Sequence, residues 1–162
     1  MSSASTLDVA SMYRRFAGMV LRRARRFYGP AEAEEVVHEV FLKVLEAPEM
    51  FRGASSPSTW LYRVTTNHCL NRLRNEARRR SLLVEHAESV PGVSSGGHGQ
   101  EATVFVDEVW RALDAEHAAI GLYYFVDGMT HDQIAEVVGC SPRTVGNRID
   151  RIDALLREAA RS

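Results

Sequence analysis

The chain of 162 residues has few cysteines, a single lysine and no long apolar run. Two cysteines, Cys69 and Cys140, are too few for a disulfide framework, so we expect free thiols. Neither is spaced from His68 or His131 like paired zinc ligands, and we predict no metal and no cofactor. No run of eighteen apolar residues occurs, and the N-terminus lacks the basic start and apolar core of a secretory signal. We therefore expect a cytoplasmic protein that does not insert into a membrane.

Signatures of catalysis are also missing. No nucleophile–base pair, paired carboxylates or phosphate-binding loop occurs at a workable spacing. The glycine-rich stretch 96–99 has no predicted strand before it and no Lys-Ser/Thr after it. We therefore do not expect an enzyme.

The charged residues are distributed unevenly along the chain. The net charge is only −1, but residues 1–80 carry fourteen basic and eight acidic side chains. Residues 81–104 carry three acidic and no basic side chains, and residues 105–162 carry six basic and ten acidic ones. Nineteen of the twenty basic residues are arginine, whose planar fork binds phosphates and bases in a bidentate manner. The asymmetry predicts two parts with different partners.

The helical periodicity and the breakers together predict an all-α fold with two small domains. Five of the ten residues in 90–99 are glycine or proline, which excludes a helix or a packed core there. We predict a first domain of three helices over 1–80, a flexible acidic linker over 81–104, and a second domain of four helices over 105–162.

In the first domain, helices are predicted over 7–28, 31–45 and 59–80. The apolar stripe of the third helix consists of Trp60, Leu61, Val64, His68 or Cys69, and Leu73. Its other face carries Arg63, Asn67 and Asn71 at a spacing of four residues. In the second helix, the apolar set runs to Leu45. The six arginines of the first helix are interpreted as a surface that is solvated or faces a protein partner: Arg14, Arg15, Arg22, Arg23, Arg25 and Arg26.

In the second domain, helices are predicted over 105–113, 115–126, 131–138 and 142–160. Thr130 and Gln133 form a predicted capping box, and Gly139 ends the third helix. Ser141 is a predicted N-cap, followed by Pro142 at the first helical position. The last two helices and their short turn therefore predict a helix-turn-helix.

Two stretches resemble the extracytoplasmic-function sigma factors of the sigma-70 family. The first consists of AEEVVHEVFLK at 33–43, FRG at 51–53 and TWLYRVTTN at 59–67. The second is DGMTHDQIAEVVGCSPRTV at 127–145, which is similar to the helix-turn-helix of that family. The resemblance implies an RNA polymerase sigma factor that binds core polymerase, recognises promoter elements and promotes DNA melting.

The resemblance also implies site residues in the first domain. The residues implied to contact the minus-ten element are Lys43, Phe51, Tyr62, Arg63 and Asn67, and the spacing of four residues on the third helix adds Asn71 to this set. The loop 50–58 would receive an extruded base, and amides and guanidinium groups on the third helix suit base edges and phosphate. A solvated polar face with a core phenylalanine is the alternative. The residues implied to dock on a coiled coil of the polymerase are Glu34, Glu35, His38 and Glu39.

The second domain would read the minus-thirty-five element with the helix that starts at 142. The candidate residues are Ser141, Arg143, Thr144, Asn147, Arg148 and Arg151. Here the chain departs from the family, because Gly146 and Asn147 stand where a basic residue and a serine are usual, and Asp150 is acidic. The base preference of this helix therefore cannot be carried over. The acidic balance of the domain predicts weak DNA binding by this domain alone.

Partners implied by the resemblance are core RNA polymerase, promoter DNA and an anti-sigma factor. Separately, we expect the free chain to be a monomer. Two alternatives are a helix-turn-helix transcriptional regulator outside polymerase, and a sigma-like adaptor that binds protein partners. The first would need a dimer and a sensor domain, and the second is kept open by Gly146 and Asp150.

Overall fold

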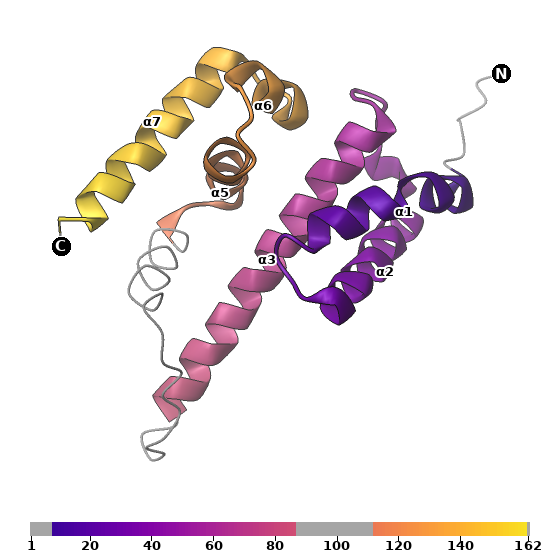
Figure 1. The fold of residues 1–162 in the computed structure, drawn as a ribbon, viewed down its shortest axis with the longest axis horizontal. Coiled ribbons are helices and arrows are strands. Elements are labelled where there is room, and N and C mark those ends of the chain that lie inside the picture. The colour runs from indigo at the N-terminus through magenta and orange to yellow at the C-terminus, as the bar shows by residue number, and fades with distance from the viewer. Residues whose placement is uncertain (1–7, 87–111, 162) are drawn as a thin grey trace. The chain divides into compact units, whose positions relative to one another are not determined.

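The computed structural model of the protein describes residues 8–86 and 112–161 (Figure 1). Every regular element in these two ranges is helical, which confirms the all-α prediction. The chain divides into two compact units, Met1–Cys69 and Leu70–Ser162. Most of the predicted linker and of the predicted helix 105–113 lies outside the described residues, so these two predictions stay predictions.

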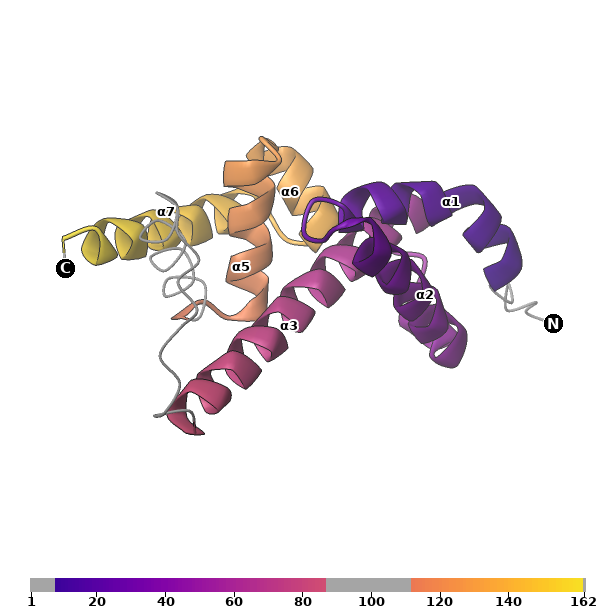
Figure 2. The same cartoon turned by 60° about the horizontal axis from the view of Figure 1, so that its bottom comes forward.

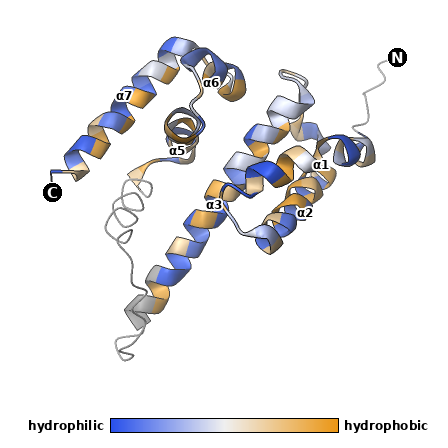
Figure 3. Ribbon diagram, viewed as in Figure 1, coloured by the Kyte–Doolittle hydropathy of each residue, from blue (hydrophilic) through white to orange (hydrophobic). Residues whose placement is uncertain are grey.

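The first unit contains α1 (Val9–Ala24), α2 (Pro30–Glu46), the 3-10 turn η1 (Pro48–Met50) and the start of α3 (Pro57–His86). α1 and α2 pack against each other (Figures 1 and 2). Each also forms a side-chain hydrogen bond to α3, α1 through Arg23 and α2 through Glu39. Polar and apolar residues alternate along these helices, as expected for elements with one buried face (Figure 3).

The ends of the first helices differ from the predicted ends. α1 stops at Ala24 rather than Tyr28, because residues 25–28 turn and bring the Tyr28 hydroxyl to the carbonyl of Cys69, 3.4 Å away. Gly29 and Pro30 do not only stop a helix, since they are the N-cap and first residue of α2.

α3 is longer than predicted at both ends. It begins at Pro57, where the Ser56 hydroxyl accepts a bond from the backbone N–H of Thr59 at 3.2 Å. It continues to His86, six residues past the predicted end at Arg80, and no glycine or proline interrupts residues 58–86.

The core of the first unit forms from one face of each helix. Its buried apolar side chains are Met12, Val20 and Ala24 of α1, Ala33, Val36, Val37, Val40, Phe41 and Val44 of α2, and Trp60, Leu61 and Cys69 of α3. The predicted stripe of α3 is confirmed at Trp60, Leu61 and Cys69, whereas Val64 and Leu73 are only half-buried. The expected inward position of Leu45 is wrong, because its side chain is 59% exposed.

In the second unit, the described elements after α3 are α5 (Ala115–Gly121), the π-helical turn η2 (Leu122–Val126), α6 (His131–Val138) and α7 (Pro142–Ala159). α7 packs against both α5 and α6. The core is built mainly from Ile120, Tyr123, Ile134, Val145 and Ile152, all at most 1% exposed. The predicted helix 115–126 is therefore α-helical only to Gly121 and then widens into a π turn.

The helix-turn-helix is confirmed with its predicted caps. Thr130 and Gln133 form both bonds of the capping box, at 3.2 and 2.9 Å. Gly139 has a φ of 79°, the left-handed conformation that ends α6 without steric cost for glycine. Ser141 caps α7 by accepting the backbone N–H of Thr144 at 3.1 Å. These contacts fix where α7 starts.

Candidate nucleic-acid interface

The face of α3 opposite the core carries the three polar residues predicted to meet DNA. Arg63 and Asn71 are exposed, and Asn67 between them is half-buried. Behind them, Thr65 is fully buried and its hydroxyl donates to the carbonyl of Leu61 at 2.7 Å. A buried hydroxyl bonded to its own helix leaves no unsatisfied polar group, so α3 presents this face from a well-packed support.

Tyr62, at the edge of that face, rests on a buried arginine. The Arg23 guanidinium lies 4.5 Å from the centre of the Tyr62 ring, and its Nε donates to the Thr66 hydroxyl at 2.9 Å. Arg23 is only 5% exposed, so its prediction as part of a solvated or polymerase-facing surface is wrong. Its position three residues after Val20 and four before Phe27 places it in the apolar stripe of the predicted helix 7–28, and this spacing is the signal in the sequence.

Phe51 lies in the loop that leads into α3. Its ring is half-buried and meets the Trp60 ring edge-on, with centroids 5.2 Å apart. Gly53, two residues later, has a φ of 71° and lets the loop turn. The loop therefore holds an aromatic ring beside the first turn of α3, where the predicted base pocket would be.

Lys43 and Glu39 of α2 meet at one histidine of α3. The Lys43 Nζ lies 2.8 Å from the His68 Nδ1, and the His68 Nε2 lies 2.6 Å from a Glu39 carboxylate oxygen. The resemblance implies a DNA contact for Lys43 and a polymerase contact for Glu39, and the helical spacing predicts only that His68 or Cys69 lies in the apolar stripe. The structure instead brings the three side chains together.

The exposed face of α2 extends beyond the predicted docking residues. Glu35 and His38 are exposed, and so are Leu42 and Leu45, at 54% and 59%. These four positions follow the spacing of three and four residues that a packed helix partner requires. Leu45 was missed because an apolar residue in an amphipathic helix is first assigned to the core, and Leu42 was not considered.

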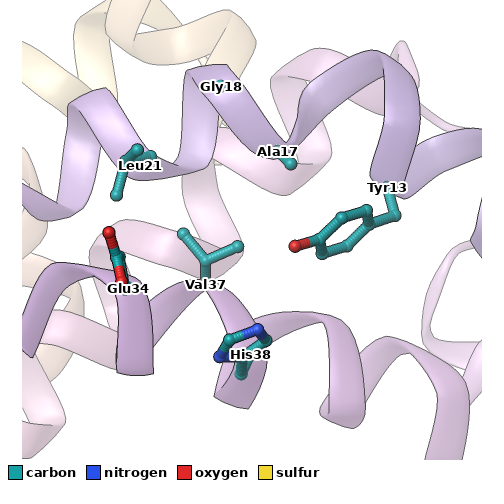
Figure 4. A pocket seen from close by; sticks show the side chains of 7 residues that line it. All are labelled: Tyr13, Ala17, Gly18, Leu21, Glu34, Val37 and His38. Atoms are coloured by element: carbon teal, nitrogen blue, oxygen red, sulfur yellow. The ribbon is translucent and has the colours of Figure 1, made fainter.

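A shallow groove of about 320 Å³ lies between α1 and α2 next to that face (Figure 4). Its floor is apolar, and Tyr13 and Glu34 reach over it from opposite helices, with His38 at its edge. The lining residues are Tyr13, Ala17, Gly18, Leu21, Glu34, Val37 and His38. Glu34 and His38, two of the four predicted docking residues, therefore border this groove. Glu39 instead bonds His68.

The start of α7 presents the other predicted DNA-facing residues. Arg143, Asn147 and Arg151 are exposed, and their spacing of four residues places them on one face. The hydroxyls of Ser141 and Thr144 lie 2.9 Å apart at the helix N-terminus, where backbone N–H groups attract phosphate. Arg148 differs, because it is half-buried and forms an ion pair with Glu116 of α5.

Hydrogen bonds lower the pKa of one carboxylate in the second unit. The backbone N–H and side chain of His117 bond the Asp114 carboxylate and hold its pKa below the usual value.

Within residues 8–86 and 112–161, no group of three or more histidine, cysteine, aspartate or glutamate side chains is arranged to hold a metal ion. Cys69 and Cys140 are free thiols, as predicted. No helix in this part of the chain is both long and apolar enough to cross a membrane.

Comparison with known proteins places both units in one family. Residues 12–79 match the family model of sigma-70 region 2, and residues 116–152 match that of sigma-70 region 4. The chain is 30% identical to the ECF RNA polymerase sigma-E factor of Haemophilus influenzae, over 91% of this chain and 82% of that one. It is 28% identical to the sigma-E factor of Escherichia coli K12, over 85% and 78%.

Two solved structures align with most of the chain. The sigma factor RpoE from Bartonella quintana, in complex with the anti-sigma factor NepR, is 17% identical with a TM-score of 0.46 and covers 95% of this chain and 97% of that one. CnrH, in complex with the cytosolic domain of CnrY, is 20% identical with a TM-score of 0.47 and covers 96% and 89%.

Proposed function

We propose which surfaces carry out promoter recognition in this chain, which belongs to the extracytoplasmic-function (ECF) sigma factors of the sigma-70 family. It is an RNA polymerase sigma factor, a transcription initiation factor and not an enzyme, whose partners are core polymerase and promoter DNA. Minus-ten recognition, core binding and minus-thirty-five recognition use three different exposed faces in this proposal.

The exposed face of α3 reads and melts the minus-ten element. The exposed Arg63 suits phosphate, and the amide of Asn67 suits a base edge. Tyr62, whose ring packs on Arg23, and Phe51, whose ring meets Trp60 edge-on, are the aromatic side chains beside them, and unstacked bases bind aromatic side chains with little sequence preference. Asn71 continues the same face by one more turn of helix. This assignment rests on the exposure of Arg63 and Asn71 on one side of α3, while Thr65 on the other side is fully buried. A helix that is held by a packed core loses little conformational entropy when its exposed face binds DNA.

Core polymerase binds the exposed face of α2, over Glu35, His38, Leu42 and Leu45. The two leucines supply apolar area, and the acidic end, which includes Glu34, supplies complementarity to a basic helix. A coiled coil of the polymerase is the partner whose geometry fits this spacing. The groove beside Tyr13 would accept a side chain from that partner.

The second unit reads the minus-thirty-five element with α7. Arg143, Asn147 and Arg151 face the major groove, while Ser141 and Thr144 with the helix N-terminus meet a phosphate. Arg148 acts indirectly, because its ion pair with Glu116 fixes α7 on α5.

The chain would act in the cytoplasm, as a monomer when free and one copy per holoenzyme. An anti-sigma factor would hold it inactive by covering exposed apolar faces such as Leu42 with Leu45, or Tyr124 with Phe125 and Val126. Light scattering of the purified chain tests the monomer, and a dimer would contradict it.

The test is reconstitution with purified core polymerase, followed by single-round transcription from the promoter of the chain's own operon. Asn67→Ala should reduce melting at least several-fold with unchanged core affinity, and Arg143→Ala should reduce only the upstream footprint. Leu42→Asp should reduce core affinity. The matched control for Arg143→Ala is Arg157→Ala, and the one for Leu42→Asp is Leu83→Asp. Both positions are exposed, and these substitutions should leave the upstream footprint and the core affinity unchanged.

Each result either supports or rejects an assignment. Equal loss of melting and core affinity in Asn67→Ala would reject the assigned face of α3. An unchanged upstream footprint in Arg143→Ala would reject its role in base or phosphate contact. Specific transcription that survives Leu42→Asp with full core affinity would move the dock away from the α2 face.

A further inference from the structure

The strongest unassigned feature is the ring of His68 between two charged side chains of α2. Glu39 and Lys43 stand four residues apart, with the glutamate first, a spacing at which the two would ordinarily pair directly. Instead His68 lies between them, with contacts of 2.6 Å to Glu39 and 2.8 Å to Lys43. The His68 side chain is only 12% exposed, so packing as well as bonding holds the ring.

The partners fix which ring nitrogen carries the proton. A lysine ammonium group can only donate, so Nδ1 of His68 accepts from Lys43. The proton of the neutral ring is then on Nε2, which donates to the Glu39 carboxylate. Both nitrogens are used, one in each role, and among the described residues His68 takes one of the three N–H donors of Lys43, which leaves two for another partner.

We propose that His68 is a positioning residue for promoter opening, which holds the Lys43 ammonium in place for the DNA backbone. This proposal rests on the assignment of Lys43 to the minus-ten element. A free lysine side chain samples many rotamers, and a contact that requires one of them costs entropy on binding. The exposed Lys43, anchored by one bond to a nearly buried ring, is ordered before DNA arrives.

Two substitutions separate the two nitrogens of the ring. The amide oxygen of asparagine replaces an acceptor near the Nδ1 position, whereas the amide nitrogen of glutamine replaces a donor near the Nε2 position. His68→Asn therefore keeps the partner of Lys43, and His68→Gln keeps the partner of Glu39. The two variants differ by one methylene and serve as controls for each other.

The measured quantity is the affinity of the holoenzyme, assembled at saturating core polymerase, for a labelled fork-junction DNA. This DNA contains the minus-ten element of a promoter that the holoenzyme transcribes. Lys43→Ala and His68→Gln should each weaken binding about three- to tenfold, and each should lower the slope of log affinity against log salt by up to about one. His68→Asn should stay within about twofold of the wild type. The double variant Lys43→Ala with His68→Gln should be no weaker than Lys43→Ala alone, because both remove one interaction.

The outcomes distinguish this proposal from the one it rests on. An unchanged affinity in Lys43→Ala would reject the DNA role of Lys43 itself. A loss in Lys43→Ala without a loss in His68→Gln would leave that role standing and overturn the positioning role. Additive losses in the double variant, or equal losses in both histidine variants with equal drops in melting temperature, would show that His68 only supports the fold.

Discussion

Two glycines of the helix-turn-helix should respond in opposite directions to the same substitution. Gly146 lies inside α7 with ordinary helical backbone, and a Cβ built there would meet only the His131 ring, at 3.6 Å. That is normal van der Waals contact, so Gly146→Ala should gain the helix propensity of alanine, about 1 kcal/mol. Gly139 has a φ of 79°, and Gly139→Ala should lose about 1–2 kcal/mol through the backbone alone, since nothing lies within 4 Å of the new Cβ.

Hydrogen exchange of the full-length chain measures both effects locally. Peptides that cover α6 and α7 report the free energy of opening of this unit without interference from the first unit. A gain of about 1 kcal/mol slows exchange through the opened state about fivefold, and Gly139→Ala should speed it by at least that factor. Peptides from α1 and α2 provide the internal control and should not change.

Faster exchange in Gly146→Ala would contradict this prediction, because α7 would then need glycine for a closer approach to His131 than 3.6 Å implies. A separate outcome concerns DNA. If Gly146→Ala stabilises α7 but abolishes the upstream footprint, the missing side chain is a requirement for entry into the major groove and not a tolerated weakness.

Two further predictions concern side chains that support these units. The pKa of Asp114 is lowered because the carboxylate accepts a hydrogen bond from the backbone N–H of His117. The charged carboxylate therefore stabilises the second unit at every pH above the ordinary aspartate pKa. This stabilisation is lost as the pH falls through the lowered pKa of Asp114. Asp114→Ala should cost about 1 kcal/mol near neutral pH and less in strong acid by urea unfolding, and a cost that does not shrink in acid would contradict this. Arg23→Met should destabilise the first unit by about 1–2 kcal/mol through its lost contacts with Tyr62 and Thr66, measured by exchange in α1. The Arg22→Met variant, at an exposed position, is its control and should stay within about 0.5 kcal/mol of the wild type, and equal effects would reject the role of burial.

The helix-turn-helix was predictable because its ends depend on local chemistry. Thr130 with Gln133, Gly139, and Ser141 with Pro142 each satisfy or replace backbone groups within a few residues, and the structure contains all of these caps. The end of α1 was not predictable in this way. The apolar pattern continues past Ala24, but the contact of Tyr28 with the Cys69 carbonyl belongs to tertiary packing.

The π turn at the end of α5 shows a second limit. A helical pattern of apolar residues runs through 115–126, and an added residue in one turn changes which of them face inward without changing the composition. Leu122 and Tyr123 are buried, whereas Tyr124, Phe125 and Val126 are exposed. Periodicity of 3.6 residues cannot predict this change of face, just as it could not separate Leu45 from the core of α2.

The polar residues inside apolar stripes connect the fold to the proposed function. Arg23 in α1 and His68 in α3 both occupy positions where the pattern calls for an apolar side chain, and both are nearly buried. Each contacts one residue of the predicted minus-ten set, Arg23 the ring of Tyr62 and His68 the ammonium of Lys43. Buried polar groups are costly unless bonded, so an apolar replacement that packs well would be expected there if packing were the only requirement. If both residues instead orient DNA contacts, their replacement should lower promoter melting by more than the loss of stability accounts for.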